Sequence, residues 1–114
     1  MRRPESILMD ILRAIDNIEN YMRGVDYHSF ESDQEKIDAV LRNLEIIGEA
    51  VKNLPNKVKR KQKEIEWKSI SAMRDVLIHQ YFGVDLEIVW KTIKEDLPEF
   101  KKKIKKMLDE IQQK

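Results

Sequence analysis

Apolar residues recur at intervals of three and four positions along nearly the whole chain, and this spacing constrains the fold more than any other feature. Such spacing places them on one face of an α-helix, and no stretch shows the strict alternation that indicates a strand. Only three glycines and three prolines interrupt the pattern, and 114 residues fit one domain. We therefore predict a single all-α domain over residues 1–114, an antiparallel bundle of four to five helices.

Local signals indicate where the first helix begins and ends. Pro4 is favoured in the first turn of a helix, and Gly24 can adopt the left-handed conformation that ends one. A loop is predicted for residues 25–31. Ser32 and Glu35 have the spacing of a capping box, in which each side chain satisfies a free backbone N–H at the start of the next helix.

The later helices follow from the same kinds of signal. The second is predicted over residues 33–53 and the third over 67–82, where Gly83 would end it. Asp85 is a candidate N-cap for a fourth helix, and Pro98 would open a fifth. Each of these helices carries one apolar stripe, and the stripes should meet in a common core.

Composition excludes several classes of protein. The chain has no cysteine and only two histidines far apart in sequence, so we predict neither a disulfide framework nor a metal site, and no cofactor. No Gly-rich phosphate loop is present. No segment approaches the length of a membrane span, and the first residues do not resemble a signal peptide. We therefore expect a soluble, cytoplasmic protein with no membrane partner.

Two basic segments, residues 57–63 and 101–106, stand out in a chain whose net charge is only +1. Overall charge therefore makes no case for nucleic acid. Each segment has two interpretations, which are a solvated charged surface or a surface that contacts phosphates. The sequence leaves both open.

The predicted helix 67–82 has two dissimilar faces at about 100° per residue. One is an apolar stripe that consists of Ile70, Met73, Val76 and Leu77. The other mixes large apolar residues with polar ones, namely Trp67, Ser71, Asp75, Ile78 and His79, with Arg74 and Tyr81 at its rim. Large apolar groups are seldom left in water without a partner. We therefore predict that Trp67 and Ile78 lie in a subunit interface.

Arg74 and His79 are the residues on this face best suited to chemistry. An arginine fork can bind phosphate oxygens and neutralise charge at phosphorus, and a histidine can transfer protons near neutral pH. RNA supplies its own nucleophile, the 2′-hydroxyl, so the pair suits RNA cleavage without a metal. A symmetric dimer would bring two such pairs into one cleft. The alternative is a surface salt bridge between Asp75 and His79.

Two blocks of the sequence together resemble the HepT toxins of the HEPN ribonuclease superfamily. The first is Arg74, four residues, His79, one residue and Tyr81, followed by FGVD at 82–85. The second is VLRNLEIIGEA at residues 40–50, which is similar to the second helix of that family. The resemblance covers nearly the whole chain. It implies a helical bundle that dimerises around the motif and cleaves RNA, tRNA or mRNA, without a metal.

The resemblance also implies roles for individual residues. Arg74 would clamp the phosphate and His79 would transfer the proton, while Asp75 stands where the family has a polar supporting residue, often asparagine. Tyr81 matches the tyrosine that a partner antitoxin, a minimal nucleotidyltransferase, modifies with AMP. An adenylyl group there would add bulk and negative charge beside the clamp and so block RNA. A buried core tyrosine is the alternative for Tyr81.

Supporting roles are predicted for Ser71 on the motif helix and for Arg42 and Asn43 on the polar side of the second helix. Arg42 and Asn43 would orient the cleft, and the alternative for Arg42 is a helix salt bridge with Asp38. For the whole protein, the alternative function is a non-catalytic helical dimer. It would only bind its nucleotidyltransferase partner or a nucleic acid.

Overall fold

The structure is a computed structural model that describes residues 2–79 and 85–113, except for the side chains of residues 74–79. Every regular element in these ranges is helical, which confirms the predicted all-α class. In chain order the elements are α1 (Pro4–Met22), α2 (Tyr27–Glu31), α3 (Gln34–Asn53), α4 (Asn56–Lys59), α5 (Trp67–His79), α6 (Leu86–Lys91), the π-helical turn η2 (Thr92–Asp96) and α7 (Leu97–Gln112).

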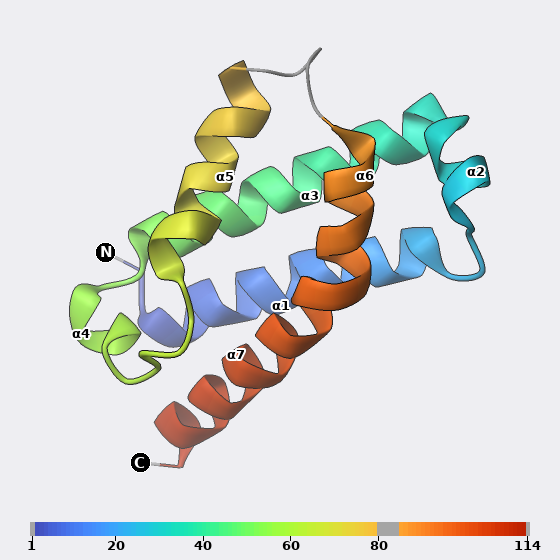
Figure 1. Ribbon diagram of the computed structural model, residues 1–114. Helices are drawn as coiled ribbons and strands as arrows, with labels where there is room; N and C mark the ends of the chain where they lie inside the picture. The colour runs from blue at the N-terminus through green and yellow to red at the C-terminus, as the bar shows by residue number, and fades with distance from the viewer. Residues whose placement is uncertain (1, 80–84, 114) are drawn as a thin grey trace.

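Helices α1 and α3 form the centre of the bundle. They lie side by side in opposite directions, α5 packs on α3, and α7 packs on α1 (Figure 1). Their predicted apolar stripes are buried, and the fully enclosed side chains include Leu8, Ile15, Val40 and Ile104. Burial of each such side chain contributes about 1.5–3 kcal/mol relative to its exposure to water. The apolar stripes therefore fix which faces of the long helices meet.

The prediction of a loop over residues 25–31 is wrong in part, because this segment contains the short helix α2. The carboxylate of Asp26 accepts a hydrogen bond from the backbone N–H of Ser29, which satisfies a free donor at the helix start. Phe30 is fully buried beneath this helix. A capped turn with one deeply buried aromatic residue is stable enough to be helical despite its length.

The predicted capping box at Ser32 is also wrong. The N-cap of α3 is Asp33, whose carboxylate accepts a hydrogen bond from the N–H of Lys36 at 3.1 Å. The hydroxyl of Ser32 instead donates to the carbonyl oxygen of His28 in α2. Because Ser32 is the C-cap of α2, it closes that helix, and the neighbouring Asp33 caps the next one.

The basic segment 57–63 packs against the rest of the protein and is not a fully solvated connection. It begins with α4, where Val58 is buried, and Gln62 and Ile65 are buried in the chain that follows. The remaining positions of the segment are basic. The apolar and amide anchors therefore hold a row of cations close to the start of α5.

The last third of the chain follows the predicted boundaries closely. The carboxylate of Asp85 accepts a hydrogen bond from the N–H of Glu87 at 2.9 Å, which confirms it as the N-cap of α6. Helix α7 begins at Leu97, one residue before Pro98. The π turn η2 ends two residues before this proline, whose ring would clash with a carbonyl of a regular α-helix. No described helix is long and apolar enough to cross a lipid bilayer.

Candidate functional site

Helix α5 contains most of the residues that the sequence singled out. Arg74, Asp75, Ile78 and His79 all fall within its bounds, so the predicted helix is confirmed over this stretch. The side chains of these four residues lie outside the described part of the structure, as does the whole of Tyr81. The described part of the site is therefore the first two turns of α5 and the chain that precedes them.

Trp67, the first residue of α5, is half-buried and has partners within its own chain. Its indole N–H donates to the carbonyl oxygens of Lys59 at 3.0 Å and Gln62 at 3.1 Å. Its ring meets the ring of Phe100 edge-on, with 6.1 Å between centroids. The helical wheel placed Trp67 opposite the core, because a wheel contains no information about the chain segments that fold over the end of a helix. Its predicted role in a dimer interface stays a prediction.

Ser71 lies one turn after Trp67 and is also half-buried. Its hydroxyl donates to the carbonyl oxygen of Lys68 at 3.2 Å, three residues earlier in the same helix. A serine that bonds its own helix in this way keeps acceptor capacity for a further partner. Its predicted role in supporting the motif is therefore compatible with its geometry.

A hollow of about 450 Å³ lies between α4, the chain that follows it and the start of α5. It is lined by Trp67 and Ser71 together with polar and basic side chains, which are Asn56, Lys59, Arg60, Lys63 and Lys68. We name its four cations, Lys59, Arg60, Lys63 and Lys68, the α4–α5 basic group. The sequence indicated three of them as part of a basic run. It did not indicate Lys68, which belongs to the group only because the chain folds back onto α5.

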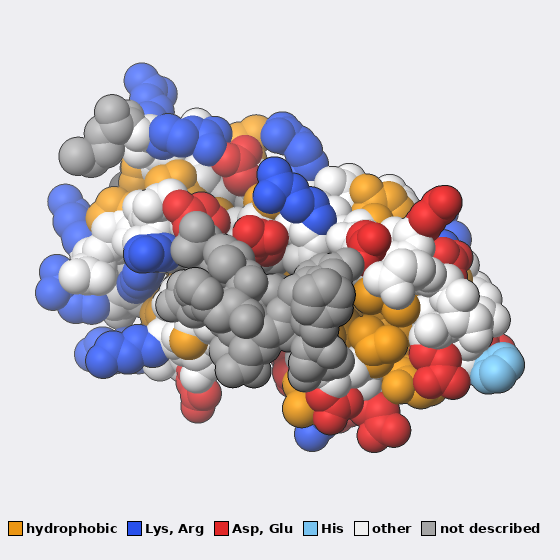
Figure 2. Space-filling view, turned by 90° about the horizontal axis from the view of Figure 1, so that it is seen from above, with side chains coloured by type: hydrophobic (Ala, Val, Ile, Leu, Met, Phe, Trp, Pro, Cys, Tyr) orange, Lys and Arg blue, Asp and Glu red, His pale blue; other side chains and the backbone are white. Residues whose placement is uncertain are grey.

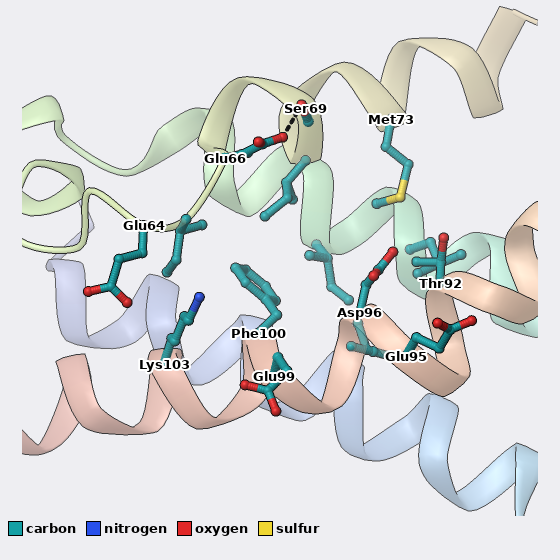
Figure 3. A pocket seen from close by; sticks show the side chains of 15 residues that line it. Glu64, Glu66, Ser69, Met73, Thr92, Glu95, Asp96, Glu99, Phe100 and Lys103 are labelled. Carbon is teal, nitrogen blue, oxygen red and sulfur yellow. Dashed lines mark hydrogen bonds between the residues drawn. The ribbon is translucent and has the colours of Figure 1, made fainter.

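A second hollow, of about 520 Å³, lies on another face of α5, between that helix, α3 and α7. Met73 and Phe100 reach into it, and carboxylates surround it (Figure 3). Its charged lining residues are Glu64, Glu66, Glu95, Asp96, Glu99 and a single cation, Lys103. An acidic rim repels phosphates, so this hollow does not suit RNA.

Charge is distributed unevenly over the described surface. Figure 2 shows Lys and Arg side chains gathered over the end of the molecule that holds α4, while Asp and Glu predominate toward the end that holds α2. The helix α5 lies between these ends in the view of Figure 1. The chain's net charge of +1 therefore conceals a basic end and an acidic end.

Arg42 and Asn43, the supporting residues predicted on α3, lie in different surroundings. Arg42 is exposed and lines a hollow between α1 and α3 that also includes Asp10 and Glu45. Asn43 is buried: its amide oxygen accepts a hydrogen bond from Asn17 of α1 at 3.1 Å, and its amide N–H donates to a carbonyl of α3. Asn43 thus joins α1 to α3, and the role of both residues in a cleft stays a prediction.

The remaining histidine has no feature of a catalytic group. His28 lies in α2 with its side chain 89% exposed, and its Nδ1 is 3.7 Å from a carboxylate oxygen of Glu31. Among the residues that the structure describes, no cluster of His, Asp and Glu side chains is arranged to hold a metal ion.

The described fold is a small all-α bundle in which one helix, α5, contains both Arg74 and His79 and borders a basic hollow. A family model described as "Ribonuclease HepT-like" matches residues 11–107. This match extends from α1 to α7 and includes all of α5. The chain belongs to the HepT-like ribonuclease family.

Curated relatives support this assignment. The chain is 48% identical over 106 residues to "Probable ribonuclease HepT" of Thermococcus cleftensis, which covers 93% of this chain and 96% of the relative. It is 42% identical to "Putative RNase TTE0752" of Caldanaerobacter subterraneus, over 95% and 96% of the two chains. It is 43% identical to "Putative RNase MJ0125" of Methanocaldococcus jannaschii, over 96% and 95%. No solved structure gives a significant match.

Proposed function

We propose that this protein is a metal-independent endoribonuclease that acts as the toxin of a HEPN–nucleotidyltransferase toxin–antitoxin pair in the cytoplasm. The observation that carries the proposal is the family match over residues 11–107, within which α5 contains both Arg74 and His79. The names of the relatives, which call them ribonucleases, support the reaction class. RNA, either tRNA or mRNA, is the proposed substrate.

The proposed reaction uses the 2′-hydroxyl of the RNA as nucleophile. His79 accepts the hydroxyl proton as the 2′-oxygen attacks phosphorus, and the bond from phosphorus to the 5′-oxygen breaks. A protonated histidine donates the proton that the leaving 5′-oxygen needs. The products are a 2′,3′-cyclic phosphate and a 5′-hydroxyl. Arg74 binds the phosphate oxygens and stabilises the charge that develops on them.

A homodimer would supply the second histidine. Each protomer offers one His79, whereas the acid and the base act in the same turnover, so the partner subunit's His79 would take the other role. Ile78 lies in the same helical turn as His79, so an interface through the Ile78 face of α5 would bring the two helices together. Trp67 would lie at the edge of this interface.

We further propose that AMP on Tyr81 switches the enzyme off. The phosphate of an adenylyl group carries negative charge, and the nucleoside adds bulk, two residues after His79. Both would oppose the approach of an RNA phosphate to Arg74. The nucleotidyltransferase antitoxin would transfer the group from ATP with release of pyrophosphate.

Cleavage of total tRNA and of an mRNA in chelator tests the proposal. Purified wild type is compared with Arg74→Ala and His79→Ala, after intact mass has confirmed that no adenylyl group is attached. Loss of a general acid or base lowers the rate by about 10²–10⁴-fold, so His79→Ala should be nearly inactive. Loss of a donor that stabilises the developing charge costs about 10²–10³-fold, so Arg74→Ala should also be nearly inactive. Wild-type cleavage no faster than that of the variants would overturn the enzyme assignment and favour a binding-only module.

The composite site has its own test in the oligomeric state. Ile78→Glu should convert a dimer to a monomer in sedimentation and abolish cleavage, because it places a charge in the proposed interface. Met9→Glu, at a position of α1 that is 46% exposed, introduces the same charge elsewhere and should change neither property. A wild type that sediments as a monomer at micromolar concentration would contradict the shared cleft.

A further inference from the structure

We propose that the α4–α5 basic group, Lys59, Arg60, Lys63 and Lys68, forms a track that binds the phosphates of single-stranded RNA next to the cleavage site. This inference rests on the proposed ribonuclease function, and it adds a binding surface away from Arg74 and His79. The track would read the backbone and not the bases, because its residues are mainly cations. Its ligand is therefore a polyanionic strand of any sequence.

The first support is the lack of charge partners around the hollow. Within the described residues, none of the four cations forms an ion pair with a carboxylate, although acidic side chains are abundant in the chain. On α7, by contrast, Lys101 contacts Asp16 and Glu19, and Lys102 contacts Glu99. Like charges around one hollow repel one another, and an anion there would relieve this repulsion.

The second support is the way the chain fixes these cations in place. The indole N–H of Trp67 bonds the carbonyl oxygens of Lys59 and Gln62, so the backbone of this segment is tied to the start of α5. Val58 and Ile65 anchor the same segment on both sides through burial. A positioned set of cations loses less entropy on binding phosphates than a flexible tail of lysines would.

The third support is the position of the group relative to the motif. Lys68 and Ser71 lie on α5, and helical periodicity puts positions 75, 78 and 79 on the same side of the helix as these two. Lys68 precedes Arg74 by six residues, which is about 9 Å along a helix axis. Arg74 lies about 120° around the helix from Lys68, at the rim of this side, and a strand that runs along the side can contact both. The acidic hollow faces the other side of α5, so it would not compete for the strand.

The polar residues of the hollow complete a site for a sugar–phosphate backbone. The guanidinium of Arg60 can bind two phosphate oxygens at once, and the lysines contribute single charges. Asn56 and Ser71 add an amide and a hydroxyl, which can bond a phosphate oxygen or a 2′-hydroxyl. The chemistry thus fits RNA better than an acidic peptide, whose carboxylates are more widely and irregularly spaced.

The test measures RNA binding separately from cleavage. A fluorescent, fully 2′-O-methylated oligonucleotide cannot be cut, and its affinity for the full chain is followed by anisotropy at several salt concentrations. The variant Arg60→Gln/Lys63→Gln/Lys68→Gln removes three exposed charges of the group. The matched control, Lys102→Gln/Lys105→Gln/Lys106→Gln, removes three exposed charges of α7. Circular dichroism confirms that both remain folded.

The expected result is a weaker affinity and a shallower salt dependence for the first variant only. Each phosphate contact on a single strand contributes about 0.7 to the slope of log K against log salt, so three contacts should lower the slope by about 2. Equal losses in both variants, or none in the first, would overturn the track. Equal competition by polyglutamate of matched charge would overturn its assignment to RNA.

The outcome is distinguishable from failure of the proposed enzyme. His79→Ala keeps the basic group and Arg74, so it should retain the slope of the wild type while losing cleavage. Arg74→Ala also loses cleavage, and because it removes one phosphate contact its slope should fall by about 0.7. If the wild type binds with the expected slope but cuts no RNA, the track stands and the ribonuclease proposal fails. A single variant, Lys68→Gln, should lower the slope by about 0.7 and provides a test with minimal change to the fold.

Discussion

The two basic regions of this protein, the α4–α5 basic group and the lysine face of α7, look alike in sequence but differ in their contacts. On α7, the Nζ of Lys101 lies 2.6 Å from Glu19 and 3.1 Å from Asp16 of α1. Lys102 lies 3.7 Å from Glu99 of its own helix, and Lys103 borders the acidic hollow. The α4–α5 group instead surrounds a hollow without a described carboxylate partner.

This difference teaches that the density of basic residues does not by itself indicate a nucleic-acid surface. A lysine that already bonds a carboxylate must lose that contact before it can bind a phosphate, and the exchange gains little. A cation that faces only other cations gains from any anion. Lys101 of α7 therefore acts as scaffold, and the α4–α5 group remains available for a ligand.

The largest effect should come from the core beneath the α7 lysines. Ile104 is fully buried, so Ile104→Ala removes apolar contacts and leaves a cavity. We expect the free energy of unfolding to fall by about 2–5 kcal/mol, measured by urea denaturation. A loss below about 1 kcal/mol would contradict the view that this helix is held mainly by its apolar stripe.

The corresponding position beneath the α4–α5 group is Val58, which is 8% exposed. Val58→Ala removes two carbon atoms, whereas Ile104→Ala removes three, so its cost should be smaller, about 1.5 kcal/mol from the transfer of these groups. It should also weaken RNA binding, whereas Ile104→Ala should not do so while the protein is folded. If Ile104→Ala weakened RNA binding and Val58→Ala did not, α7 and not the α4–α5 basic group would be the region that binds RNA.

An intermediate effect is expected from Trp67→Phe, which keeps an aromatic ring but removes the indole N–H. The carbonyls of Lys59 and Gln62 then lose a donor, which costs about 1 kcal/mol of stability. RNA affinity should also fall although no charge has been removed, because the cations are no longer held in place. Urea denaturation and the anisotropy titration measure the two effects.

Trp90→Phe provides the control, since the chain has only two tryptophans and Trp90 lies in α6. Its ring contacts Tyr27 edge-on at 5.6 Å between centroids, away from the basic hollow. This substitution should leave RNA affinity unchanged. An equal loss of affinity in both variants would show that Trp67 acts through general stability and not through the position of the cations.

Much of the fold could be predicted from sequence because periodicity reports directly on the long helices. The predicted start at Pro4 and the cap at Asp85 are confirmed, and α3 matches its predicted range within one residue. The helix α2 was missed because five residues are too few to show a period. The sequence signal that could have indicated α2 is Asp26. It is an N-cap residue whose carboxylate accepts a hydrogen bond from the N–H of Ser29, three positions later.

The candidate site could be predicted only in part. The order of residues on α5 follows from helical geometry, so the motif is placed on the right helix. The contacts of Trp67 and the membership of Lys68 in the basic group depend on how residues 59–66 fold back, which no local pattern encodes. The ion pairs of Lys101 join residues more than eighty positions apart, and they too could not be predicted from the sequence.

The smallest stability effect should come from Lys101→Gln, and its pH dependence separates the two basic regions most directly. Hydrogen bonds to Glu19, and then to Asp16, raise the pKa of Lys101 above its ordinary value. Since the folded pKa is the higher one, the contribution of Lys101 is fully present below the unfolded pKa and is lost as pH rises through the folded pKa. The difference in unfolding free energy between wild type and Lys101→Gln should therefore be up to about 1 kcal/mol at neutral pH and shrink in alkaline solution.

Lys102→Gln, at a side chain that is 77% exposed, should cost nothing measurable. A difference that grows in alkaline solution would show that Lys101 does not hold α7 to α1 as a cation, and a loss of RNA affinity in Lys101→Gln would make α7 part of the binding surface.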